Sequence, residues 1–338
     1  MLLSLGLGIV IWLLTALITW RWIRFAEARQ IQDGPERRRL HDAFIPRAGG
    51  IGIALVMLAS CSVIFFSVAD RSTLWLLPIA AIFLFSILGF WDDLKPISAG
   101  RKLALHLLAA TLLWLMCNFL LSMDFLMAVV VALAYLSTVN IWNFMDGSNG
   151  MVGMQSLLMV VGFISLGSYT TATYYYALVL AVACLGFLPF NFPVARVFLG
   201  DVGSHVLGAA VAGLAILAYS ENQLTALEIA CLLSALWIDA LLTLIRRVFR
   251  GFKVTRPHLS HLYQYAIRSG KTHGAICGYY AGWTIAVILV IGLSRDLSEF
   301  GQRIVLMGLI VMGAATHQGF RLFVLKSVRN SKIHKSEA

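Results

Sequence analysis

The sequence predicts an all-α, polytopic integral membrane protein with about eleven transmembrane helices. Of its 338 residues, 60% are hydrophobic and 12% are charged, and the charged share is about half that of a typical soluble domain. The apolar residues form long runs, and a helix needs roughly 20 such residues to cross a bilayer. These runs lack the polar and apolar alternation of membrane β-strands. We therefore expect helices, which satisfy their backbone polar groups inside lipid.

Eleven apolar runs are predicted as spans, and two of them are short. They cover residues 2–20, 49–68, 73–90, 103–121, 125–141, 154–167, 173–190, 205–219, 224–245, 275–293 and 305–325. The stretch around residues 170–173 can also be divided differently, which leaves ten helices as the alternative. The organisation that follows is one transmembrane domain over residues 1–325 and a basic tail at 326–338.

The basic residues predict the orientation of these spans. With the N-terminus outside and eleven spans, 23 of the 26 lysines and arginines fall on the cytoplasmic side, as the positive-inside rule expects. The C-terminus and the longer polar segments lie on that side, at residues 21–48, 91–102, 142–153, 191–204 and 246–274. Topology and anionic lipid explain the net charge of +10, so we expect no nucleic-acid partner.

Three short acidic patches interrupt the apolar sequence, and the predicted topology places all three on one membrane face. Asp92 and Asp93 form the first patch, at the end of the third span. An acid at a helix C-terminus opposes the helix dipole, which favours a functional reason for it. Adjacent carboxylates can hold a divalent cation, or one can bind a group while the other accepts a proton. A solvated helix end is the alternative.

The second patch ends the fifth span. Asn140, Asn143 and Asp146 recur every three residues, so a helix presents them on one face. The glycines that follow can end the helix and bring backbone close to a ligand. A polar helix cap with a glycine turn is the alternative, but three such groups in helical phase exceed what a cap needs.

The third patch is Gly200-Asp201, which joins the seventh and eighth spans. Asp201 precedes a helix start, where aspartate is a common N-cap. Gly203 and Arg196 lie close by in the sequence, and a helix N-terminus flanked by glycines suits a phosphate. The patch is therefore predicted as a phosphate or metal site, with a plain helix cap as the alternative.

Other polar residues are further candidates. Arg256, His258 and His261 share the long loop at 246–274, and histidine beside arginine suits phosphate contact near neutral pH. A solvated basic loop is the alternative there.

Asp239 lies inside the ninth span, where an acid is a functional candidate by default. It can equally be structural, paired with Arg246 or with a neighbouring helix.

Taken in order, these segments resemble the polyprenyl-phosphate N-acetylhexosamine-1-phosphate transferases, glycosyltransferase family 4. The resemblance covers roughly residues 41–264 and rests on five ordered motifs, which together are specific although each alone is weak. The motifs are Pro46-Arg47-Ala-Gly-Gly, Gly89-Phe-Trp-Asp92-Asp93, Asn143-Phe-Met-Asp146-Gly, Phe198-Leu-Gly200-Asp201-Val-Gly-Ser204, and the histidine loop with His258 and His261.

The resemblance implies a multi-pass enzyme of the bacterial inner membrane with a cytoplasmic catalytic cleft. It implies Mg2+ as cofactor, with Mn2+ as the alternative, and membrane lipids as surroundings. The implied reaction moves a sugar-1-phosphate from a UDP-N-acetylhexosamine-type donor to undecaprenyl phosphate and releases UMP. A direct attack by the acceptor is favoured over a covalent aspartate intermediate. Assembly as a homodimer stays open.

The resemblance also assigns roles by position. It implies that Asn143 and Asp201 hold the metal. Asp92 and Asp93 would engage or activate the lipid phosphate, and His258 and His261 would steady the diphosphate or the acceptor. The expected substrate-binding residues are Arg47, Asn140, Asp146, Asn149, Arg196 and Arg256.

Two departures from the family pattern concern donor recognition. Asn149 stands where the family usually has an acid, and the histidine run ends as His261-Leu-Tyr263-Gln264. The pattern is more similar to the branch that starts O-antigen or another surface polysaccharide than to the peptidoglycan branch, which expects a longer histidine-rich loop. The sugar stays open among N-acetylglucosamine, N-acetylfucosamine, N-acetylquinovosamine and N-acetylgalactosamine.

Three other functions remain as alternatives. One is a peptidoglycan lipid I-type phosphotransferase. Another is a transporter or flippase, which would place polar groups at the midplane and repeat its helices; this chain gathers its polar groups at one face and has one deep acid, Asp239. A CDP-alcohol phosphotransferase would need a spaced array of acids that this sequence lacks.

Overall fold

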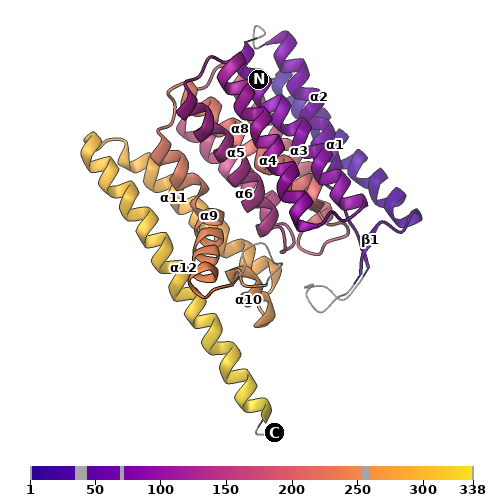
Figure 1. Ribbon diagram of the computed structural model, residues 1–338, viewed down its shortest axis with the longest axis vertical. Coiled ribbons are helices and arrows are strands. Elements are labelled where there is room, and N and C mark those ends of the chain that lie inside the picture. The colour runs from indigo at the N-terminus through magenta and orange to yellow at the C-terminus, as the bar shows by residue number, and fades with distance from the viewer. Residues whose placement is uncertain (1, 35–43, 69–71, 253–258, 337–338) are drawn as a thin grey trace.

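Helices, most of them apolar, make up most of the computed structural model, which describes residues 2–34, 44–68, 72–252 and 259–336 (Figure 1). The helices are α1 (Leu2–Ala28), α2 (Ile51–Ser67), α3 (Leu76–Leu94), α4 (Ala99–Leu115), α5 (Phe125–Met145), α6 (Met151–Leu166), α7 (Thr171–Asn191), α8 (Gly200–Ser220), α9 (Ala226–Phe249), α10 (Leu262–Arg268), α11 (His273–Ser294) and α12 (Glu299–Ser336). A 3-10 turn, η1 (Thr73–Trp75), precedes α3, and a π-helical turn, η2 (Met116–Leu120), follows α4.

Within these described ranges, nine helices are long and apolar enough to cross a membrane, and α2 and α6 are shorter apolar helices. Each of the eleven predicted spans overlaps one of these eleven helices. The predicted all-α, polytopic membrane class is therefore confirmed. The span expected at 205–219 begins earlier, at Gly200, because the Gly-Asp-Val-Gly-Ser segment forms the first turn of α8.

The helix α8 is the centre of the bundle. It is rich in glycine and alanine, and 89% of the residues in its apolar segment are buried, whereas only 22% are buried in the corresponding segments of α1 and α12. It packs against α3 and α5 along its length. Small side chains let membrane helices approach closely, so the N-terminus of α8, with Asp201 in its first turn, is held between the ends of α3 and α5.

The helices α9, α11 and α12 form the outer side of the bundle, away from α1 and α2 (Figure 1). The helix α9 packs against α11 and α12, and α11 also packs against α6. The segment expected as a tail at 326–338 continues α12 as far as Ser336. The short helix α10 lies in the loop predicted at 246–274 and contacts α11 and α12.

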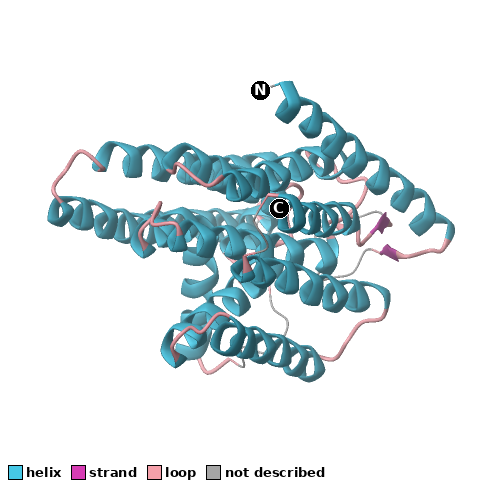
Figure 2. Cartoon of the chain, turned by 90° about the horizontal axis from the view of Figure 1, so that it is seen from above, coloured by secondary structure: helices cyan, strands magenta, loops and turns pink. Residues whose placement is uncertain are grey.

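The described strands are β1 (Gln32–Asp33) and β2 (Ile45–Pro46), an antiparallel pair at one edge of the bundle (Figure 2). After β2 the chain runs beside the start of α8. The N–H of Phe198 donates to the carbonyl of Pro46 at 2.8 Å, and the N–H of Gly49 donates back to Phe198 at the same distance. A Cβ at Gly50 would lie 2.1 Å from Cα of Gly203, so this approach requires glycine. The pairing brings Arg47 next to the α8 N-terminus.

Candidate active site

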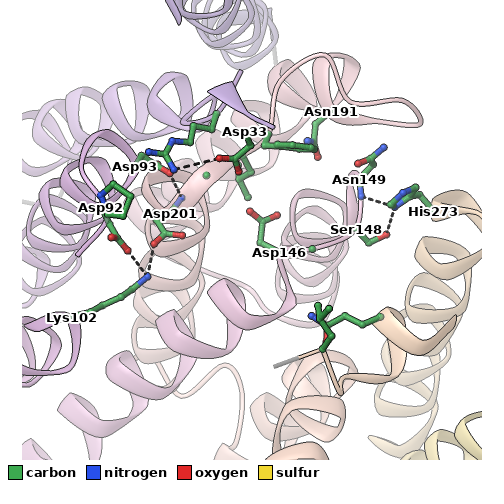
Figure 3. A pocket seen from close by; sticks show the side chains of 18 of the residues that line it. Asp33, Asp92, Asp93, Lys102, Asp146, Ser148, Asn149, Asn191, Asp201 and His273 are labelled. Atoms are coloured by element: carbon green, nitrogen blue, oxygen red, sulfur yellow. Dashed lines mark hydrogen bonds and ion pairs between the residues drawn. The ribbon is translucent and has the colours of Figure 1, made fainter. Parts of the chain in front are cut away.

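The three acidic patches meet at one cavity of about 570 Å³ (Figure 3). Its wall includes Asp92 and Asp93 from α3, Asp146 after α5 and Asp201 from α8. The three patches therefore lie together at one end of the helical bundle. Arg47 and Lys102 bring positive charge to the same wall.

Asp93 fixes the start of α8. Its Oδ1 accepts a hydrogen bond from the N–H of Asp201 at 3.0 Å, and its Oδ2 accepts one from Val202 at 2.9 Å. The side chain is only 4% exposed. Gly200 has φ +76°, and a Cβ there would lie 2.6 Å from Asp93 Oδ2, so only glycine suits this close approach. Asp93 thus positions Asp201 by occupying two of the free N–H groups of the helix.

Lys102, in the first turns of α4, joins the first and third patches. Its Nζ donates to Asp92 Oδ2 at 2.8 Å and also pairs with Asp201. Asp92 accepts a further bond from the N–H of Ile97 at 2.7 Å. The Asn143 amide donates to Asp201 Oδ1 at 2.7 Å and to Ser204 Oγ at 3.1 Å. Two carboxylates therefore converge on one ammonium, and each is oriented by a second partner.

Asp146 occupies the middle of the cavity wall (Figure 3). Burial, with the nearby charges of Asp201 and Asp93, raises the pKa of Asp146 well above its usual range. Tyr263 lies close to this turn: its hydroxyl donates to the carbonyl of Phe144 at 3.0 Å, and a Cβ at Gly147 would lie 2.3 Å from that hydroxyl.

Gln264 also lines the cavity, and its amide donates to the Tyr263 hydroxyl at 3.1 Å. Tyr263 and Gln264 therefore stand beside the Asp146 turn.

Neutral groups form the other part of the wall. The N–H of Asn149 and the hydroxyl of Ser148 both approach Nδ1 of His273, at 3.2 and 3.1 Å. Asn191 accepts a hydrogen bond from the N–H of Gly150 at 2.7 Å. The turn after Asp146 is thus held by α7 on one side and by α11 on the other.

The structure brings together some of the predicted site residues and separates others. Arg47, Asp92, Asp93, Asp146, Asn149 and Asp201 line the cavity, and Asn143 reaches it through Asp201. Asn140 and Arg196 are not in its wall: the Asn140 amide bonds to the Leu136 carbonyl of its own helix, and the exposed Arg196 bonds to the Pro189 carbonyl. The predictions at Arg256 and His258 lie outside the described residues.

His261 faces the protein interior. It is 2% exposed, and its Nδ1 is 3.5 Å from Oδ1 of Asp239. Asp239 also accepts hydrogen bonds from the N–H of Leu262 at 3.0 Å and from the Tyr280 hydroxyl at 2.6 Å. His317 Nε2 lies 3.3 Å from the same carboxylate. The deep acid therefore anchors the start of α10, and the structural interpretation of Asp239 is the one these contacts favour.

Several residues of the cavity wall carry no recognisable signal in the sequence. Lys102 is not predicted as a site residue, because nothing in its spacing marks a lysine on a separate helix as a partner of Asp92. Asp33 contacts Arg47 at 3.5 Å, and it carried no motif. His273 is the first residue of α11, so a polar residue there looked like an ordinary helix start.

Asp92 and Asp201 offer the donor atoms that a divalent cation requires. Among the residues the structure describes, no group of three or more His, Cys, Asp or Glu side chains has metal-binding geometry. Mg2+ commonly takes one or two carboxylates and fills its other positions with water and substrate phosphates. Asp92 and Asp201 already share one cation, the Lys102 ammonium, so this pair of carboxylates is suited to such a Mg2+ site.

The fold and the site define a polytopic membrane protein with a polar cavity suited to phosphate and a cation at one end of its helices. Residues 75–219, which carry all three acidic patches, match the family model described as glycosyl transferase family 4. This match supports the resemblance to the polyprenyl-phosphate N-acetylhexosamine-1-phosphate transferases.

Three relatives illustrate the similarity. The chain is 31% identical over 195 residues to the undecaprenyl-phosphate alpha-N-acetylglucosaminyl 1-phosphate transferase of Thermotoga maritima. The aligned region covers 55% of this chain and 56% of that relative. It is 28% identical over 322 residues to the decaprenyl-phosphate N-acetylglucosaminephosphotransferase of Mycolicibacterium smegmatis, with 83% and 79% covered. The phospho-N-acetylmuramoyl-pentapeptide-transferase of Moorella thermoacetica is 28% identical over 289 residues, with 77% and 86% covered.

Proposed function

We propose that the protein transfers a sugar-1-phosphate from a UDP-N-acetylhexosamine to undecaprenyl phosphate and releases UMP. The observation that carries this proposal is the convergence of Asp92 and Asp201 on Lys102 at one end of a membrane bundle. Such a site can gather two phosphorylated substrates, one from water and one from lipid. The names of the relatives, which act on polyprenyl phosphates, support the acceptor.

The reaction is a phosphoryl transfer. An oxygen of the acceptor phosphate forms a bond to the phosphorus that carries the sugar, and the bond from this phosphorus to the UMP oxygen breaks. UMP leaves with the electron pair of that bond. Since both substrates are anions, the site must offset their repulsion and stabilise the leaving group.

Charge neutralisation in this mechanism comes from the cavity wall. Asp201 and Asp92 would hold a Mg2+ ion, and the Asn143 amide orients Asp201. When bound, the ion would offset the negative charge of the diphosphate. The Lys102 ammonium and the Arg47 guanidinium line the same cavity and would contact phosphate oxygens there. Asp93 keeps the first turn of α8 in place, so that Asp201 stays aligned.

The polar cavity is proposed to face the cytoplasm of a bacterial inner membrane, because 23 of the 26 basic residues favour that side. Formation of the first lipid-linked intermediate of O-antigen or another surface polysaccharide fits the replacement of histidines by Tyr263 and Gln264. The second candidate is a lipid I-type transfer. It is favoured by the pentapeptide-transferase relative, of which this chain covers 86%.

The test uses purified protein in detergent with Mg2+, undecaprenyl phosphate and a panel of UDP-sugars, with UMP release as the readout. UMP release that requires the acceptor and one of the N-acetylhexosamine donors supports the proposal. UMP release only with the UDP-muramoyl-pentapeptide supports the second candidate. Absence of UMP release with every donor contradicts both.

A further inference from the structure

The cavity has a charged part and a neutral part (Figure 3). The charged part holds Asp92, Asp93, Lys102 and Asp201. Across Asp146, the other part is lined by side chains that carry hydrogen-bonding groups without full charges: Ser148, Asn149, Asn191, Gln264 and His273. If the phosphates of a nucleotide sugar occupy the charged part, its uncharged portions extend toward these residues.

The contacts of His273 fix its tautomer. The backbone N–H of Asn149 points at Nδ1 from 3.2 Å, and the Ser148 hydroxyl lies 3.1 Å from the same nitrogen. A backbone N–H is always a donor, so Nδ1 must be an acceptor and carry no proton. The imidazole is therefore neutral and carries its hydrogen on Nε2. Among the described residues, no side chain or carbonyl accepts a hydrogen bond from Nε2.

The turn that holds His273 is itself held in place. The Asn149 amide donates to the Pro193 carbonyl at 3.2 Å, and the Cys277 thiol donates to the Asn149 carbonyl at 3.2 Å. Gly150, with φ +74°, donates its N–H to Asn191. The Asn149 side chain is thus held by the chain itself, and Nε2–H of His273 is a donor that the described contacts leave for a ligand.

We propose that His273 determines donor specificity by giving its Nε2–H hydrogen bond to an oxygen of the uncharged part of the nucleotide sugar. The acceptor is a carbonyl or hydroxyl oxygen, on either the base or the sugar. This inference rests on the proposed function, because it takes a UDP-sugar as the ligand of the cavity. The bond aligns the donor so that its diphosphate reaches Lys102 and Asp201.

Two substitutions separate donation by Nε2 from support of the turn by Nδ1. His273→Asn keeps a polar atom near the Nδ1 position, where it can accept from Asn149, but it has no group near Nε2. His273→Gln reaches the Nε2 position with an amide donor and loses the Nδ1 acceptor. Gly278→Ala is the matched control on the same helix, since a Cβ there meets nothing within 4 Å.

The measurement is the dissociation constant of UDP-N-acetylglucosamine for the whole protein in detergent, by calorimetry, with Mg2+ and no acceptor. One neutral hydrogen bond is worth about 1 kcal/mol, which corresponds to roughly a fivefold change in affinity. We expect His273→Asn to bind about fivefold more weakly than wild type, with an unchanged thermal midpoint. We expect His273→Gln to recover most of this loss, and Gly278→Ala to bind as wild type does.

Binding of UMP and UDP locates the accepting oxygen. If the fivefold loss in His273→Asn also appears with UMP, the oxygen belongs to the base or ribose. If it appears only with UDP-N-acetylglucosamine, the oxygen belongs to the sugar. Either result supports the inference.

The inference is overturned if His273→Asn binds all three ligands as wild type does while His273→Gln is weakened, since His273 then only supports the turn. It is also overturned if both variants are weakened equally. Failure of the wild-type protein to bind any of the three ligands contradicts the proposed function instead, so the two failures are distinguishable.

Discussion

Asp239 is predicted to hold α10, and through it Tyr263 and Gln264, against the cavity. The substitution Asp239→Asn tests this with little change in volume. The carboxylate accepts from the Leu262 N–H, from the Tyr280 hydroxyl and from the Thr243 hydroxyl at 3.1 Å. It also faces the imidazoles of His261 and His317 at 3.5 and 3.3 Å.

The expected loss of stability follows from these contacts. An asparagine has one acceptor oxygen, so its NH2 group must face at least one buried donor that loses its partner. Each lost or unsatisfied buried bond costs about 1 to 3 kcal/mol, and removing the charge from a buried pair costs about 3 to 5 kcal/mol in total. Taking about 3 kcal/mol, and about 2 °C for each kcal/mol in a large domain, the thermal midpoint should fall by about 6 °C.

The assay is thermal unfolding in detergent followed by tryptophan fluorescence, paired with calorimetric binding of UDP-N-acetylglucosamine. Asp124→Asn is the matched control: Asp124 caps α5 through the N–H of Met127 at 3.0 Å, and asparagine caps helices about as well as aspartate. A midpoint for Asp239→Asn within about 1 °C of the control, together with unchanged binding, would refute the anchoring role of Asp239.

Three further predictions concern the cavity itself. Lys102→Met should lower turnover by at least about 100-fold, because an ammonium that stabilises transferring phosphate is worth several kcal/mol; Lys102→Arg should retain part of the activity in the UMP-release assay. Gly200→Ala should destabilise the protein by about 1 to 3 kcal/mol, since φ is +76° and Asp93 Oδ2 lies 2.6 Å from the added Cβ; an unchanged thermal midpoint contradicts this. The pKa of Asp146 is raised in the folded protein, so unfolding releases its proton once the pH exceeds about 4, the pKa of an unfolded aspartate. The contribution of Asp146 to stability therefore falls as the pH rises above that value. Asp146→Asn should therefore gain stability relative to wild type as pH rises, and thermal midpoints between about pH 5 and 8 that change in parallel would contradict it.

The helices and the meeting of the acidic patches could be predicted from the sequence because both depend on local signals. A long apolar run fixes a span, and the alternation of spans then decides which polar ends share a face. The start of α8 is harder to predict from the sequence. The sequence places Gly200 to Ser204 in a loop, but Asp93 from a distant helix caps this segment and makes it helical.

Side-chain directions inside the site could not be predicted in the same way. Asn140 shares a helical phase with Asn143, but its amide bonds to the Leu136 carbonyl one turn earlier, a partner that any helix offers. His261 turns toward Asp239 from another helix. Lys102 and His273 reach the cavity only through packing between distant segments. Such contacts depend on non-local geometry, which spacing along the chain does not encode.

The central claim is that the bond between the two phosphates of the donor breaks, so that the sugar moves together with its phosphate. The direct measurement uses UDP-N-acetylglucosamine, or the donor that the panel selects, labelled with 32P on the phosphate next to the sugar. After incubation with undecaprenyl phosphate and Mg2+, lipid and aqueous phases are separated and counted. The account predicts label in the lipid product and unlabelled UMP in water. Label that stays in water as UDP, with the sugar in the lipid, would contradict it.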